Sequence, residues 1–165
     1  MKFKQYGVNS KDLLTLKIRM DVIPVSLAIA QSAKETGWGT SRFALEGNAL
    51  FGQWTWSKKG ISPKNKDPNQ NHKVLQFQIL KASVKAYKNN LNTHNAYREF
   101  REARAKLRQN NDVLDGLKLT QYLKNYAAIG EKYVAILENI IINSSLTDFD
   151  KAILLSTKAT KGMAL

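Results

Sequence analysis

Between residues 22 and 78 the sequence carries only three carboxylates: Glu35, Glu46 and Asp67. A carboxyl group whose pKa is raised can act as a general acid near neutral pH. Glu35 is the strongest candidate for this role. It follows a helical pattern that begins near Pro24 and stops at Gly37, and this predicts that Glu35 lies in the last turn of a helix over residues 24–36.

That helix would place Glu35 on the same face as Ala28, Gln31 and Ser32. The small side chains of this face allow another part of the chain to pack closely over it. Partial burial and the negative end of the helix dipole both raise the pKa of a carboxyl at this position. The residues therefore favour a proton donor. A solvent-facing glutamate at a helix end is the alternative interpretation.

The segments around Glu35 form a specific pattern. Residues 30–39 read AQSAKETGWG and residues 48–52 read NALFG, followed by NLNTH with AY at 90–97 and YAAIGEKYV at 126–134. Together they resemble the N-acetylglucosaminidase family of bacterial wall hydrolases, which comprises glycoside hydrolase family 73 and the related Bax-type proteins. The resemblance covers about residues 22–143.

The resemblance implies a lysozyme-like fold in which Glu35 is the catalytic acid. It also implies cleavage of the β-1,4 bond between N-acetylglucosamine and N-acetylmuramic acid in peptidoglycan glycan strands. Tyr126 matches a tyrosine that the family places near the reacting sugar, where a phenol could bind the acetamido group or stabilise positive charge. Packing between the last two helices is the alternative for Tyr126. Tyr133, seven residues later, is assigned to packing.

The second catalytic group is less well defined. A carboxylate pair needs a separation of about 5–5.5 Å for retention or roughly 6.5–9.5 Å for inversion. Asp67 is the acidic residue available in the expected β lobe, although its loop is also typical of a surface turn; Glu46 reads as a helix end or turn. Substrate assistance by the acetamido oxygen of the sugar requires no second carboxylate and is the other interpretation.

Further residues are candidates for substrate binding: Gln31, Asn48, Phe51, Trp54 and Trp56. The last three could provide flat aromatic surfaces for sugars, or could close the core between two lobes. Asn48 could instead fix its turn, and Trp38 is expected in the core. His72 and His94 lack the neighbours that a metal site needs, so no metal or cofactor is expected.

The expected fold class is mainly α (α+β), a lysozyme-like helical domain with a small β-hairpin lobe. Helices are expected from Ser10, which would cap the first one, and over 24–36, 81–92, 97–109, 112–118, 120–125 and 131–144. Strand-like segments occupy 54–56 and 74–77, after a turn-rich, glycine-containing stretch. The chain is expected to be one domain, 1–165, with its core at about 10–146. The tail, 147–165, is expected to be peripheral, with a short helix capped by Asp148.

Composition limits the partners. The 165 residues carry a net charge of +13 and no cysteine, a balance that favours polyanionic partners such as wall polymers. The densest basic stretch, 98–108, also contains Glu99 and Glu102 and resembles a solvated helix face, so nucleic acid is the weakest alternative. We expect a monomer without stable membrane insertion. The first residues lack a signal peptide, so a location in the periplasm, cell envelope or extracellular space would require one outside this sequence.

Three functions remain open at this point. The first is hydrolysis of peptidoglycan at N-acetylglucosamine. The second is lytic transglycosylation, which a single glutamate also permits. The third is a non-catalytic wall-binding module, for which an acid such as Glu35 has no purpose.

Overall fold

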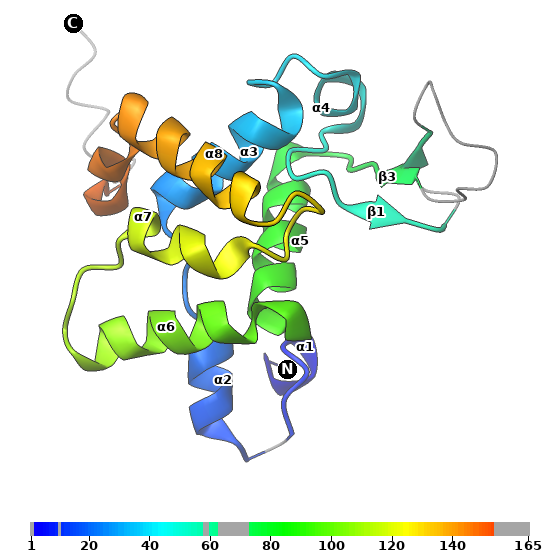
Figure 1. Ribbon diagram of the computed structural model, residues 1–165. Coiled ribbons are helices and arrows are strands. Elements are labelled where there is room, and N and C mark those ends of the chain that lie inside the picture. The colour runs from blue at the N-terminus through cyan, green and yellow to red at the C-terminus, as the bar shows by residue number, and fades with distance from the viewer. Residues whose placement is uncertain (1, 10, 58–59, 63–72, 154–165) are drawn as a thin grey trace, which may run out of the picture.

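The computed structural model describes residues 2–9, 11–57, 60–62 and 73–153. Its helices form one body, and a small β lobe projects from one side of that body (Figure 1). The prediction of a mainly helical domain with a small β lobe is confirmed. Among the described residues, no helix has the length and apolar character needed to cross a membrane.

Helix α3, Val25–Thr36, lies at the centre of the body and packs on α8 (Glu131–Asn143) and on the 3-10 helix η3 (Leu146–Lys151). Pro24 is its N-cap residue, so the helix begins at Val25, one residue later than predicted. Gly37 ends it in the left-handed conformation. Glycine adopts that conformation without a steric penalty, which explains why the helix stops here. The core around α3 is formed by apolar side chains that are almost fully buried, among them Leu27, Leu91, Phe100, Leu137 and Ile141.

Apart from α1, which was not predicted, the remaining helices follow the predicted order with shifted ends. They are α1 (Lys2–Gln5), α2 (Leu13–Arg19), α5 (Leu80–Thr93), η1 (Asn95–Tyr97), α6 (Arg98–Gln109), α7 (Gly116–Leu119) and η2 (Thr120–Leu123). Helix α2 is capped by Asp12, whose carboxylate accepts a hydrogen bond from the Thr15 amide at 2.9 Å. The predicted cap, Ser10, lies outside the described residues. The structure therefore moves the start of this helix to Leu13.

Two elements were not predicted in the stretch between α3 and α5. Helix α4, Arg42–Gly47, is capped by the side chain of Ser41 and ends at Asn48. The sheet contains β1 (Trp54–Thr55), β2 (Gly60–Ile61) and β3 (Lys73–Leu75), with β3 in the middle and both neighbours antiparallel to it. The expected hairpin is thus β1 with β3, and β2 is an additional strand.

The end of the described chain differs from the predicted tail. Asp148 lies inside η3 and does not cap a helix that starts after it. Asp150 accepts hydrogen bonds from the Ser26 amide at 2.8 Å, the Ser26 hydroxyl at 2.7 Å and the Gly116 amide at 3.2 Å. The tail therefore contacts α3 and α7 at this residue.

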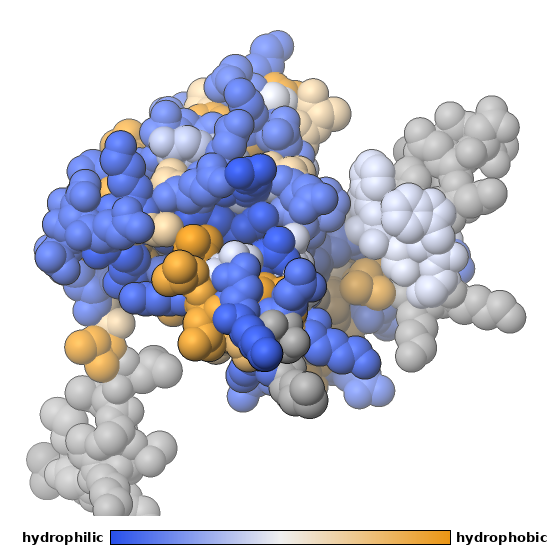
Figure 2. All heavy atoms as spheres, turned by 90° about the horizontal axis from the view of Figure 1, so that it is seen from below, coloured by the Kyte–Doolittle hydropathy of each residue, from blue (hydrophilic) through white to orange (hydrophobic). Residues whose placement is uncertain are grey.

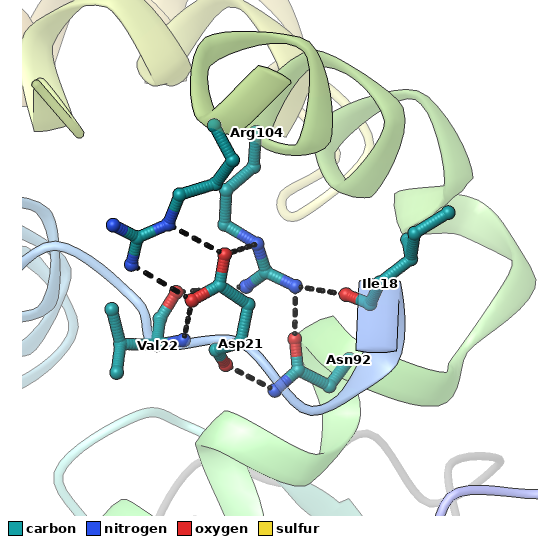
Figure 3. A network of polar contacts seen from close by, with 6 residues as sticks. Ile18, Asp21, Val22, Asn92 and Arg104 are labelled. Carbon is teal, nitrogen blue, oxygen red and sulfur yellow. Dashed lines mark hydrogen bonds and ion pairs between the residues drawn. The ribbon is translucent and has the colours of Figure 1, made fainter. Parts of the chain in front are cut away.

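A buried arginine joins helix α2 and the segment after it to the body (Figure 3). The side chain of Arg104 is fully buried and donates to the Ile18, Val22 and Asn92 oxygens at 2.7–2.9 Å. Asp21 lies 3.8 Å from its Nε atom and is also bound by Arg108. Burial lowers the pKa of Arg104 to about 10, against the effect of Asp21, so the guanidinium stays charged at neutral pH.

The interpretation of residues 98–108 as a solvated face is therefore wrong in part. Arg101 is 4% exposed and donates to the Leu91 and His94 carbonyls. Arg104 is buried in the hydrogen-bond network with Ile18, Val22 and Asn92. By contrast, Arg98 is exposed and pairs with Glu102 at 2.8 Å. This helix uses two of its cations for internal packing.

Arg104→Met should lower the free energy of unfolding by about 3 kcal/mol, because it leaves buried oxygens without a donor and Asp21 without its inner partner. Urea denaturation measures the change. Arg98→Met, on the same helix, is the control and should cost about 0.5 kcal/mol, as exposed ion pairs do. Equal losses in the two variants would contradict the structural role of Arg104.

Candidate active site around Glu35

The side chain of Glu35 is half-buried in the last turn of α3, beneath the chain that follows α4. Gly52 lies directly against it: a Cβ atom on Gly52 would stand 2.9 Å from Oε2 of Glu35. The φ angle of Gly52 is +58°, which also disfavours any other residue. The close approach of this backbone removes part of the carboxyl from water.

Tyrosines from separate elements surround this carboxyl. The Tyr126 ring, which follows η2, stacks on Tyr133 of α8 at 5.5 Å between centroids, and Tyr97 of η1 lies 5.9 Å from Tyr126. Tyr87 of α5 stacks on Phe51 at 3.8 Å. The site therefore has walls of neutral aromatic side chains that carry hydroxyl groups.

Burial is the largest influence on Glu35 and raises the pKa of its carboxyl above the usual value of 4.5. A hydrogen bond from Tyr133 and the positive charge of Lys34 both act in the opposite direction. Burial also raises the pKa values of Tyr126 and Tyr133 well above the usual range, so both remain protonated donors. The electrostatics suit a carboxyl that holds its proton at a higher pH than an exposed glutamate does.

The assignment of Tyr133 to packing missed its bond to Glu35. Tyr133 is fully buried, and its hydroxyl hydrogen-bonds the Glu35 side chain. The hydroxyl of Tyr126 donates instead to the Phe51 carbonyl at 3.0 Å. The position of Tyr126 beside Tyr133 supports the packing interpretation, and its contact with a sugar stays a prediction.

Three residues predicted to bind substrate have internal roles in the structure. Gln31 is fully buried between Tyr87 and Tyr133, and the Phe51 ring is 4% exposed, so neither presents a surface for a sugar to stack on. Asn48 adopts the left-handed conformation at the end of α4 and donates to the Phe77 carbonyl at 3.1 Å. Asn48 therefore fixes its turn, which was the alternative to substrate binding.

The tryptophans are exposed. Trp54 and Trp56 are 61% and 76% exposed on the β lobe, whose surface is of intermediate hydropathy beside a mostly hydrophilic body (Figure 2). Trp38 is 62% exposed, so its predicted place in the core is wrong. Gly37, Trp38 and Gly39 all have positive φ angles, and this left-handed turn carries the indole outward.

The second carboxylate remains open. Asp67 lies outside the described residues. Glu46 is exposed on α4 and pairs with Arg42 at 3.5 Å. Within the part of the chain that the structure describes, no carboxylate contributes to the pKa shift of Glu35, and no group of acidic, histidine or cysteine side chains is arranged to hold a metal ion.

A polar cleft of about 580 Å³ lies between Gln53 and the C-terminal half of α5. Its other polar lining residues are Asn89, Asn90, Thr93, His94 and Asn95. Oε1 of Gln53 is buried and has no hydrogen-bond partner among the described residues. Gln53 directly follows Gly52, so this cleft adjoins the backbone that covers Glu35. Such a lining offers hydrogen bonds from amide, hydroxyl and imidazole groups, which suits a polar ligand.

Gly52→Ala should lower activity on cell-wall glycan, the substrate class that the family resemblance implies, by about 100-fold, because the new methyl group displaces the Glu35 carboxyl. Gly39→Ala is the matched control: φ is +81° there, but no atom lies within 4 Å of the added Cβ. Both variants should lose about 1 kcal/mol of stability from backbone strain. If Gly39→Ala loses as much activity as Gly52→Ala, steric contact with Glu35 is not the cause.

The sequence of this chain is similar to those of known proteins. "Protein bax" of Escherichia coli (strain K12) is 38% identical over 119 residues, which are 72% of this chain and 42% of that relative. The chain thus matches less than half the length of the curated relative, and no solved structure matches it. The model of the glucosaminidase family, described as mannosyl-glycoprotein endo-beta-N-acetylglucosaminidase, matches residues 10–146. Since this match covers most of the sequence, the chain belongs to the glucosaminidase family, a family of glycoside hydrolases.

Proposed function

We propose that the protein is an endo-β-N-acetylglucosaminidase that cleaves β-1,4 bonds of peptidoglycan glycan strands, with Glu35 as general acid. The half-buried Glu35, whose pKa is raised in a wall of tyrosines, is the observation that carries this proposal. Family membership supports the reaction class. Peptidoglycan as the substrate, and a monomer in the periplasm, cell envelope or extracellular space, follow from the sequence motifs and belong to the same proposal.

In the first step Glu35 donates its proton to the departing glycosidic oxygen while positive charge develops at the anomeric carbon. The bond between that carbon and the oxygen breaks, and Glu35 is left as a carboxylate. Tyr133 stabilises this carboxylate by its hydrogen bond, and Lys34 favours it by charge. The site thus holds the proton before the reaction and tolerates its loss afterwards.

For the second step we favour attack by the acetamido oxygen of the sugar on its own anomeric carbon. Water then opens the resulting ring, and Glu35 takes up the proton of that water. Among the described residues no carboxylate contributes to the pKa shift of Glu35, and this route requires none. A water molecule activated by Asp67 is the alternative, and Asp67→Asn would separate the two, because only the water route needs that carboxylate.

Two surfaces fit a glycan. The cleft beside Gln53 offers amide, hydroxyl and imidazole groups to sugar hydroxyl and acetamido groups. Trp54 and Trp56 offer exposed indole rings on the lobe that begins one residue later. The net charge of +13 favours attachment to an anionic wall and predicts weaker binding as salt rises.

Glu35→Gln should reduce glycan cleavage about 1000-fold, since the amide cannot donate the acid's proton. The folded pKa of Glu35 is raised above its unfolded value, so the folded state binds this proton more tightly. Its stabilising effect is complete below about pH 4.5 and is lost as the pH rises through the folded pKa. The variant should therefore be at least as stable as the wild type at pH 7 by thermal melting. Wall lysis by the variant at the wild-type rate would contradict the assignment of Glu35.

Mass spectrometry of the released fragments separates the remaining functions. Reducing N-acetylglucosamine ends support the proposed hydrolysis. Anhydromuramic ends would establish lytic transglycosylation instead. Sedimentation with insoluble wall, without any released fragment, would leave a binding module.

Trp56→Ala should raise KM for glycan fragments about tenfold, equivalent to about 1.4 kcal/mol, and leave kcat and the melting temperature nearly unchanged, because the ring is exposed. Trp38→Ala is the control, since that indole is similarly exposed but lies on the turn after α3. Steady-state kinetics over a series of substrate concentrations measures both. An unchanged KM for Trp56→Ala would exclude this indole as a sugar platform.

A further inference from the structure

Hydrogen bonds connect four side chains in a buried chain that ends at Glu35. The Tyr87 hydroxyl of α5 donates to Oε1 of Gln31 at 2.7 Å. Nε2 of Gln31, on α3, donates to the Tyr133 hydroxyl at 3.0 Å, and Tyr133 of α8 bonds the Glu35 side chain. Tyr87, Gln31 and Tyr133 are each 0–1% exposed, so water has no access to replace any of these partners.

The chain has a single direction when Glu35 is ionised. A carboxylate only accepts hydrogen bonds, so Tyr133 must donate its proton to Glu35 and offer its oxygen as the acceptor. The amide nitrogen of Gln31 must then face Tyr133, which turns the amide oxygen toward Tyr87. Because an amide oxygen only accepts, Tyr87 is left to donate to it. Each bond in the series strengthens the next by polarising it.

We propose that Gln31 and Tyr133 are positioning residues, which together keep a hydroxyl donor on one oxygen of Glu35 and leave the other oxygen to carry the proton toward the substrate. Only the destination of that proton rests on the function proposed above. The chain itself needs no substrate. It assigns a role to a fully buried glutamine in the middle of α3, where a polar side chain would otherwise be costly.

The chain balances the burial of the acid. Removal from water makes Glu35 hold its proton more tightly, whereas a donor that persists after ionisation stabilises the carboxylate. Among the described residues, the titratable groups that interact electrostatically with Glu35 are Lys34 of α3, Tyr97 of η1, Tyr126 after η2 and Tyr133 of α8. The tyrosines are neutral at working pH. Tyr133 is the one whose hydroxyl bonds the carboxyl itself.

The test is a ¹³C NMR titration of the Glu35 carboxyl carbon in the substrate-free protein, with the signal identified by its loss in Glu35→Gln. Tyr133→Phe should move the midpoint to higher pH by about one pH unit, a tenfold change in proton affinity, because it removes a bond to the charged form. Gln31→Met should move it in the same direction by less. The double variant should match Tyr133→Phe alone, since Gln31 acts through Tyr133.

Tyr97→Phe is the matched control. It removes a hydroxyl from the same aromatic cluster, but that hydroxyl bonds the Asn90 side chain and not Glu35. Its midpoint should stay at the wild-type pH. Because Phe and Met are close in size to the residues they replace, loss of packing is small. If one single variant fails to fold, the other still tests the hydrogen-bonded chain.

An unmoved midpoint in Tyr133→Phe, or additive shifts in the double variant, would overturn the proposal even if the melting temperatures fall. The titration does not depend on catalysis. A shifted midpoint together with full wall lysis by Glu35→Gln would refute the proposed function and leave the positioning chain standing. An unmoved midpoint in Tyr133→Phe together with lost wall lysis in Glu35→Gln would refute the positioning chain and leave the proposed function standing.

Discussion

The site depends on a carboxyl group that is half removed from water and that no guanidinium of the described residues influences. Burial alone would keep the proton on Glu35, and a close arginine would strip it off. The fold resolves this with neutral donors, and Lys34 on the same helix is the only cation that contributes to the pKa shift among the described residues. The arginines of α6 are held elsewhere, on carbonyls and on Asp21. A chain with 26 basic residues thereby keeps its acid protonatable.

Much of the fold could be predicted because periodicity and stop signals agree. The helix that carries Glu35 begins after a proline and ends at a glycine, and both signals act locally. Helix α4 was missed because it has only six residues and lies among glycines, where packing rather than propensity stabilises a helix. Trp38 was misplaced because composition favours burial of an indole, whereas three successive left-handed residues direct it to solvent.

The helix position and partial burial of Glu35 could be predicted, but the partners of its side chain could not. A spacing of seven residues is typical of one helix face, yet Tyr126 lies before the start of α8, and the spacing does not say which hydroxyl reaches Glu35. Gln31 was recognised as a neighbour of Glu35, but its burial depends on α5 and α8, which are distant in sequence. Arg101 and Arg104 illustrate the same limit. A basic stretch with interspersed glutamates has the same sequence pattern whether its arginines are exposed to solvent or buried in the protein.

The contact of Asp150 with Ser26 joins segments 124 residues apart. Pro24 provides no side-chain cap for α3, so the carboxylate that accepts from the first turn comes from the far end of the described chain. A ribosome must therefore have synthesised nearly the whole sequence before this helix can acquire its cap. Completion of the helix that carries Glu35 and closure of the domain become one event, and a nascent or truncated chain ending before residue 150 would carry Glu35 on a helix whose N-terminal end is still open.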